Sequence, residues 1–113
     1  MRDEERDRQL AIATTILAQL GGNRFAAMTG ASNFVGLTAG LMFKLPGGGG
    51  GAKQGINRVE IELEPADLYT IRFSNIRFGR LDMQIKTISE HFGIYHDQLR
   101  GIFTAETGLD THL

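Results

Sequence analysis

Two stretches of the chain, residues 58–64 and 69–73, alternate apolar and polar side chains with a period of two. Side chains on a β-strand point alternately to opposite faces, so each stretch predicts a strand with one apolar face. Between the two stretches stand Pro65 and Asp67, residue types that are typical of a tight turn. Together they predict an antiparallel hairpin with one buried face. The apolar positions are Val59, Ile61, Leu63, Tyr69, Ile71 and Phe73.

The register of this hairpin can also be predicted. If Leu63 pairs with Tyr69, the apolar side chains face one another along one side, and Glu60 lies opposite Arg72 on the other. A shift by one residue would move every apolar side chain into water, which disfavours any other register. The remaining expected pairs are Ile61 with Ile71 and Val59 with Phe73.

Both ends of the chain show the three-and-four spacing of amphipathic helices. The first helix is predicted from about Asp3 to Leu20, and its charged start, residues 1–8, is expected to project and fray. The second is predicted from His96 to Thr107, with Gly108 placed to end it. The apolar stripes are Leu10, Ala13, Ile16, Leu17 and Leu20 in the first helix, and Leu99, Ile102 and Phe103 in the second.

Shorter apolar segments predict further strands on either side of the hairpin. Before it, we expect strands at residues 24–28, 34–37 and 39–45, with a turn at residues 29–33. After it, we expect a turn near Asn75 or Gly79, because both residue types favour turns. Leu81, Met83 and Ile85 then alternate with polar residues, which predicts a last strand that runs towards Phe92 and is broken by Gly93.

Residues 46–55 are rich in glycine and predict a mobile loop. Pro46 has no backbone donor for a strand, and the run Gly47–Gly51 carries too much conformational entropy to stay ordered unaided. A glycine run can also cradle phosphate, but that motif needs lysine followed by serine or threonine. Here the lysine, Lys53, is followed by Gln54, which disfavours a nucleotide-binding loop.

These elements predict an α+β fold: a single domain over residues 1–113, with one curved antiparallel sheet of four or five strands and the N-terminal and C-terminal helices packed on one face. The chain has no cysteine, which excludes disulfides and a cysteine nucleophile. No apolar run reaches the roughly 20 residues of a membrane span, and the N-terminus does not resemble a secretory signal. We therefore expect a cytoplasmic protein without a membrane partner.

No group of residues predicts an enzyme. The histidines His91, His96 and His112 lack the spacing of a metal site, and a surface role is favoured over convergence of the first two with Asp97. The three glutamates within residues 60–64 are expected on a solvated strand face rather than as an acid–base pair. We therefore expect no catalytic residue, no metal and no cofactor.

The distribution of charge favours a binding function. The net charge is −1, but residues 24–86 hold eight basic and five acidic residues, a net charge of +3. Guanidinium groups beside an aromatic ring can hold phosphate and stack on bases. The alternative is that Arg58 and Arg72 only neutralise Glu60 and Glu62 on neighbouring strands. The candidate nucleic-acid-binding residues are Arg24, Lys44, Arg58, Arg72, Arg77, Arg80 and Lys86.

Six short motifs follow one another along the chain: Asn23–Phe34, Leu41–Leu45, Gly55–Val59, Asp67–Tyr69, Leu99-Arg100 and Thr107–Leu109. This pattern resembles a family of small, mostly uncharacterised proteins encoded by phages and prophages, over nearly everything after Leu20. The resemblance implies a compact helix–sheet–helix fold and no known active site, and the run Gly47–Gly51 departs from it. The order of elements is also similar to one half of a TATA-binding-protein repeat, an analogy of fold that does not determine function.

We therefore expect a phage-derived, non-enzymatic binding protein of the host cytoplasm that contacts nucleic acid through the polar face of the sheet. The alternative is a protein–protein interaction module, such as an inhibitor of a host enzyme or defence complex, acting alone or as a homodimer. This alternative rests on the exposed edge strands of a small open sheet, and on Phe34, Met42 and Ile76, for which a small core has little room.

Overall fold

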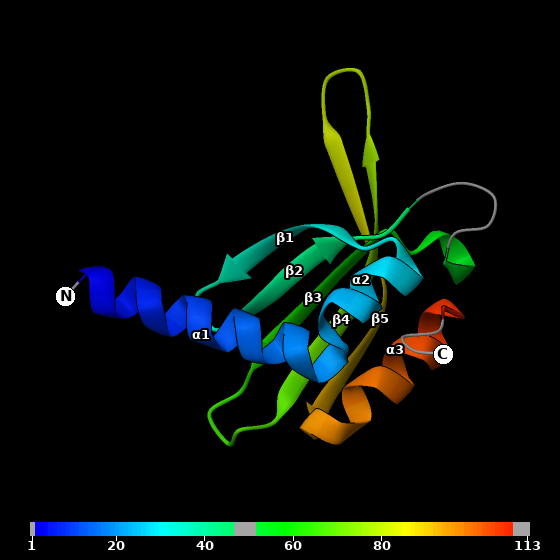
Figure 1. Ribbon diagram of the computed structural model, residues 1–113. Coiled ribbons are helices and arrows are strands. Elements are labelled where there is room, and N and C mark those ends of the chain that lie inside the picture. Colours follow the sequence, from blue (N-terminus) through cyan, green and yellow to red (C-terminus); the bar gives the residue numbers. More distant parts are fainter. Residues whose placement is uncertain (1, 47–51, 110–113) are drawn as a thin grey trace.

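The computed structural model describes residues 2–46 and 52–109, and in these residues three α-helices cover one face of a five-stranded sheet (Figure 1). The strands are antiparallel and lie side by side in chain order. This arrangement confirms the predicted α+β class and the helices at both ends. The elements are α1 (Arg2–Leu20), α2 (Gly22–Thr29), β1 (Ser32–Leu37), β2 (Gly40–Lys44), the 3-10 turn η1 (Lys53–Gly55), β3 (Arg58–Leu63), β4 (Tyr69–Phe78), β5 (Met83–Ile94), the 3-10 turn η2 (His96–Gln98) and α3 (Leu99–Thr107).

The central β3–β4 hairpin has the predicted register. Leu63 pairs with Tyr69, and Glu60 lies opposite Arg72. The apolar residues between these ends are fully buried beneath the helices: Val59, Ile61, Ile71 and Phe73. Burying one such side chain contributes about 1.5–3 kcal/mol relative to leaving it exposed, so a one-residue slip would forfeit several contributions of this size.

A cluster of aromatic rings joins the helices to the sheet. The ring centroids of Phe25 in α2 and Phe103 in α3 lie 5.0 Å apart. Phe43 of β2 lies 5.4 Å from Phe25, and Phe73 of β4 lies 6.4 Å from Phe103. All four side chains are fully buried. The same core therefore holds two helices and the middle of the sheet together.

Residues 24–28, which we predicted to be a strand, form α2 instead. A short apolar run is compatible with either structure, and Ala26 and Ala27 favour the helix. Gly30 ends α2 in the left-handed conformation, with φ of 75°, and its N–H donates to the carbonyl of Ala26. The turn predicted for residues 29–33 is correspondingly shorter, because β1 already begins at Ser32.

The first turns of α1 extend beyond the edge of the sheet (Figure 1). Ala13, Ile16 and Leu20 are buried, as predicted, but Leu10 is 57% exposed. The predicted apolar stripe therefore contacts the core only from Ala13 onwards. At the other end of the chain, Gly108 ends α3 with φ of 76°, as predicted.

Beyond Ser74, β4 no longer has β3 beside it and pairs only with β5. We call the resulting two-stranded ribbon, residues 75–86, the arm; it projects from the body of the protein (Figure 1). The turn at its tip is closed by the N–H of Gly79, which donates to the carbonyl of Asp82 at 2.7 Å. The chain therefore turns at Gly79 and not at Asn75. Leu81, which we assigned to the last strand, lies in this turn.

The last strand continues past the point where we expected it to end. Gly93 belongs to β5, with φ of 65°, next to an irregularity in the pairing with β4. The carboxylate of Glu64 accepts a hydrogen bond from the N–H of Gly93 at 2.9 Å, which stabilises this bend. Glycine tolerates a positive φ, so here it bends the strand instead of breaking it. The loop predicted over residues 46–55 is described only in part: residues 53–55 form η1, and the run Gly47–Gly51 lies outside the described residues.

Candidate nucleic-acid interface

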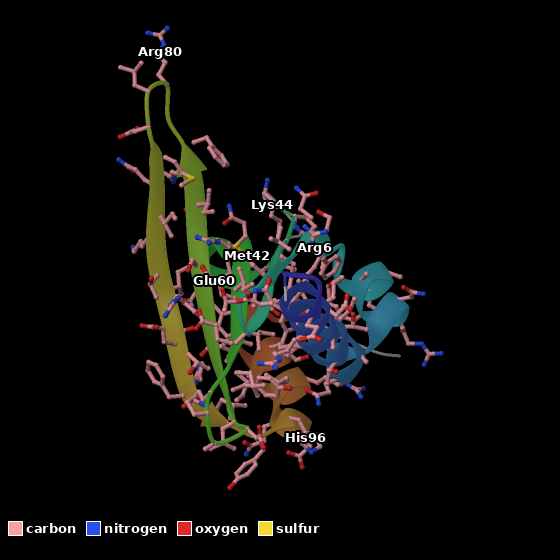
Figure 2. All side chains as sticks on the ribbon, turned by 90° about the vertical axis from the view of Figure 1, so that its left-hand side faces the viewer. Arg6, Met42, Lys44, Glu60, Arg80 and His96 are labelled. Carbon is pink, nitrogen blue, oxygen red and sulfur yellow. The ribbon has the colours of Figure 1, made fainter. Side chains whose placement is uncertain are left out.

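The structure does not bring the seven candidate cations onto one surface. Arg24 lies on α2, in the helical layer. A second group lies on the sheet face opposite the helices, which we call the open face: Lys44, Arg58 and Arg72. The third group lies on the arm: Arg77, Arg80 and Lys86. Arg80 lies at the tip of the arm (Figure 2).

Ion pairs neutralise the two arginines of the open face. Arg58 contacts the carboxylate of Glu60 at 2.8 Å, and Arg72 contacts it at 3.3 Å. Arg72 also donates to Glu90 of β5 at 2.8 Å, and this hydrogen bond raises the pKa of the guanidinium. Arginines bound to carboxylates have little positive potential left for phosphate. The alternative interpretation, in which glutamates neutralise Arg58 and Arg72, is therefore correct for Glu60. The second partner of Arg72, Glu90, was not predicted.

One face of the arm is polar and basic. Asn75 pairs with Lys86, and Arg77 pairs with Gln84, so these four side chains project from the same face, on the side of the sheet that carries the helices. A pocket of about 670 Å³ lies between this face and η1, where Gln54 also lines it. None of the described residues that line this pocket carries a carboxylate.

The chemistry of this pocket suits an anion. Guanidinium, ammonium and side-chain amide groups all present N–H donors, and charge-assisted hydrogen bonds to phosphate are among the stronger ones in proteins. Within the described part of the chain, Arg77, Arg80 and Lys86 form no salt bridge, in contrast to the arginines of the open face. Their charge is therefore available to a ligand.

The base of the arm is held in place by the segment that precedes β3. The side chain of Asn57 accepts a hydrogen bond from the N–H of Ile76 at 2.7 Å and donates one to its carbonyl at 2.9 Å, as a paired strand would. The side-chain amide of Asn75 donates to the carbonyl of Gly55 in η1. These contacts fix the direction in which the arm leaves the body. The sequence did not predict that Asn57, Asn75, Gln54 and Gln84 belong to this site.

The opposite face of the arm is apolar. Ile76 pairs with Ile85, and Phe78 pairs with Met83. Phe78 is 71% exposed, and Leu81 at the tip is 98% exposed. The arm is thus an amphipathic ribbon with a basic face and an apolar face, and helices cover neither of them (Figure 1).

The arm also differs from the rest of the chain in charge. Residues 75–86 hold three basic residues and one acidic residue, a net charge of +2, so the remaining residues carry −3 of the total of −1. By net charge, the arm therefore attracts a polyanion, whereas the remaining residues taken together repel one.

Two further features bear on other classes of site. His91 lies 2.6 Å from the carboxylate of Glu106 in α3 and packs its ring against Phe73, with the ring centroids 6.2 Å apart. These contacts tie β5 to α3. No group of metal-ligating side chains occurs within residues 2–46 and 52–109, and in the same residues no helix has the length and apolar character needed to cross a membrane.

Comparison with known proteins provides no relative: no family model matches the chain, and no curated protein or solved structure matches it significantly. The resemblance to the phage family and the analogy with the TATA-binding protein therefore stay predictions.

Proposed function

We propose that the protein is a non-enzymatic nucleic-acid-binding protein, and that it contacts nucleic acid through the arm instead of the polar face of the sheet. One observation carries this proposal: the arm is a two-stranded ribbon that projects beyond the body and concentrates cations that have no ion-pair partner among the described residues. These cations are Arg77, Arg80 and Lys86. They are three of the seven residues that the sequence predicts for this role.

The charge of the remainder of the chain supports the same orientation. A body with a net charge of −3 repels a polyanion, whereas an arm with a net charge of +2 attracts it. Nucleic acid therefore approaches the protein from the arm. The phosphates would lie against the basic face, where the pocket between Arg77, Lys86 and Gln54 offers N–H donors.

The shape of the arm favours double-stranded DNA over double-stranded RNA. The major groove of B-DNA is about 12 Å wide and admits a two-stranded β-ribbon. The major groove of an A-form RNA helix is deep and too narrow for side chains to read. The exposed Phe78 and Leu81 would then contact base edges, such as the methyl groups of thymine, while the cations hold the backbone.

A phage or prophage origin and a location in the host cytoplasm belong to the same proposal. The motifs that resemble the phage family support them. The arm is the part of the proposal that can be tested on the purified protein.

The test is the fluorescence anisotropy of a labelled DNA duplex titrated with the protein at several salt concentrations. We expect binding at low salt, and a slope of about −3 for the logarithm of the binding constant against the logarithm of salt concentration, because three cations release counterions from about three phosphates. The arm variant Arg77→Gln, Arg80→Gln, Lys86→Gln should lose most of this affinity.

A matched control removes the same amount of charge elsewhere. The variant Arg6→Gln, Arg8→Gln, Arg24→Gln changes three exposed residues on α1 and α2 and should keep the affinity of the unmodified protein within about threefold. The proposal is wrong if no anisotropy change occurs at high micromolar protein, or if the two triple variants lose equal affinity.

A further inference from the structure

The apolar face of the arm forms one wall of a second hollow, separate from the basic pocket. This hollow has a volume of about 370 Å³ and lies on the open face, between the arm and the strands β1 and β2. We call it the open-face groove. Its apolar walls are Val35, Met42, Ile76, Met83 and Ile85.

The groove exposes several apolar side chains that lie next to one another. Met83 is 52% exposed, and Val35, on the opposite wall, is 45% exposed. Contiguous apolar surface of this kind on a small protein commonly marks an interaction site. Met42 is also held in position, because the Nε of Arg58 lies 3.0 Å from its sulfur. The sequence pointed to Phe34, Met42 and Ile76 as poor fits for the core, and two of these three line the groove.

The charge around the groove selects among the partners that could occupy it. Its described lining residues include the cations Lys44 and Arg58 but no carboxylate. Arg58 already forms an ion pair with Glu60, whereas Lys44 forms no ion pair in the described part of the chain. The Nζ of Lys44 lies 5.8 Å from the centre of the Phe78 ring. A ligand that combines apolar side chains with a carboxylate beside them would therefore match both the walls and the charge.

A second copy of the chain matches less well. The apolar surface that another copy could offer most readily is its own arm, which carries a net charge of +2. Docking that arm beside Lys44 would bring like charges together, which costs binding free energy.

We propose that the open-face groove binds an acidic amphipathic segment of another protein, with two or three apolar side chains against Val35, Met42 and Met83 and a carboxylate beside Lys44. This role goes beyond DNA binding, because the groove is formed by β1, β2 and the side chains of Ile76, Met83 and Ile85, and includes neither the basic face of the arm nor Phe78 and Leu81. A protein with both sites would bring an acidic partner to DNA.

The test uses two short fluorescein-labelled peptides, one of alternating leucine and glutamate and one of alternating leucine and lysine, in anisotropy titrations with the full chain. We expect the glutamate peptide to bind at least about tenfold more tightly than the lysine peptide, because Lys44 attracts only the former. Val35→Glu and Lys44→Gln should each weaken binding of the glutamate peptide severalfold.

A control separates the groove from other surfaces. Leu10→Glu places the same carboxylate at an apolar residue of similar exposure on α1, outside the groove, and should leave peptide affinity unchanged. Equal binding of the two peptides, or loss of binding on Arg77→Gln but not on Val35→Glu, would overturn the proposal. So would a concentration-dependent dimer in sedimentation velocity that Val35→Glu abolishes, since a second copy would then occupy the groove. DNA binding by Val35→Glu should persist, which keeps this test independent of the proposed function.

Discussion

The β3–β4 hairpin and the arm continue one pattern of alternating side chains but differ in what lies beside them. In the hairpin, helices cover the apolar face, and ion pairs neutralise the arginines of the open face, as between Arg72 and Glu90. In the arm, which has no third strand beside it, Phe78 stays exposed and Arg77 and Lys86 stay unpaired in the described part of the chain. Alternation therefore decides which side chains share a face. The neighbouring elements decide whether that face stabilises the fold or is available for binding.

The largest expected difference between the two regions is in stability. Phe103→Ala removes a fully buried ring from the aromatic cluster and should cost about 3–5 kcal/mol of unfolding free energy. Leu81→Ser at the tip of the arm should change it by less than about 0.5 kcal/mol, since Leu81 is 98% exposed. Urea denaturation followed by circular dichroism measures both. A comparable loss in the two variants would show that the arm contributes to the core.

A second change tests the ion pairs of the open face. Glu60→Gln removes the carboxylate that Arg58 and Arg72 share, and the partly buried position of Glu60 makes the loss larger than for a surface pair. We expect a loss of about 1–2 kcal/mol in the free energy of unfolding. The exposed Glu4→Gln on α1 serves as the control. An unchanged stability of Glu60→Gln would mean that the open-face arginines are as weakly held as those of the arm.

A third change acts where the body and the arm meet. Asn57→Ala removes both side-chain hydrogen bonds to the backbone of Ile76. Amide hydrogen exchange at Ile76 should become about fivefold faster, equivalent to roughly 1 kcal/mol of local stability, while exchange at Ile61 in the hairpin changes little. Asn23→Ala, at an exposed residue of α2, should leave both amides unchanged. Equal acceleration at both amides would indicate that the arm unfolds only with the whole protein.

The smallest effect is expected at high pH and comes from the end of the hairpin. Burial raises the pKa of Tyr69 above its usual 10.0, so the unfolded chain loses this proton first. The contribution to stability is complete below pH 10 and is lost as the pH rises through the raised value in the folded state. In Tyr69→Phe, this part of the alkaline loss should disappear from the free energy of unfolding measured by urea between neutral and alkaline pH. An identical pH dependence in both proteins would contradict the burial of an ionisable phenol at this position.

The hairpin could be predicted because its information is local. Period two, a turn signal and matching charges at Glu60 and Arg72 select one register without knowledge of the rest of the fold. The assignment of residues 24–28 to a strand was wrong because a short apolar run does not distinguish the two structures until its packing is known.

The arm could not be predicted in the same way, and neither could the difference between its cations and those that ion pairs neutralise. No local signal shows that β3 begins at Arg58 while β4 continues to Phe78, and this difference in length creates the arm. One irregularity in the β4–β5 pairing, between Phe73 and Ser74, places Glu90 opposite Arg72, which a count from the turn would not reveal. The sequence therefore identified the cations Arg77, Arg80 and Lys86 but could not separate them from the cations that ion pairs neutralise.

We assign the DNA contact to the arm and not to the polar face of the sheet. The most direct measurement is a titration of the isotopically labelled protein with a short DNA duplex, followed through the backbone amide shifts in two-dimensional NMR spectra. This assignment predicts shift changes concentrated in residues 75–86 and in the adjoining η1, with small changes at Glu60 and Arg72. Changes centred on the open-face residues of β3, or an absence of any change at low salt, would contradict it.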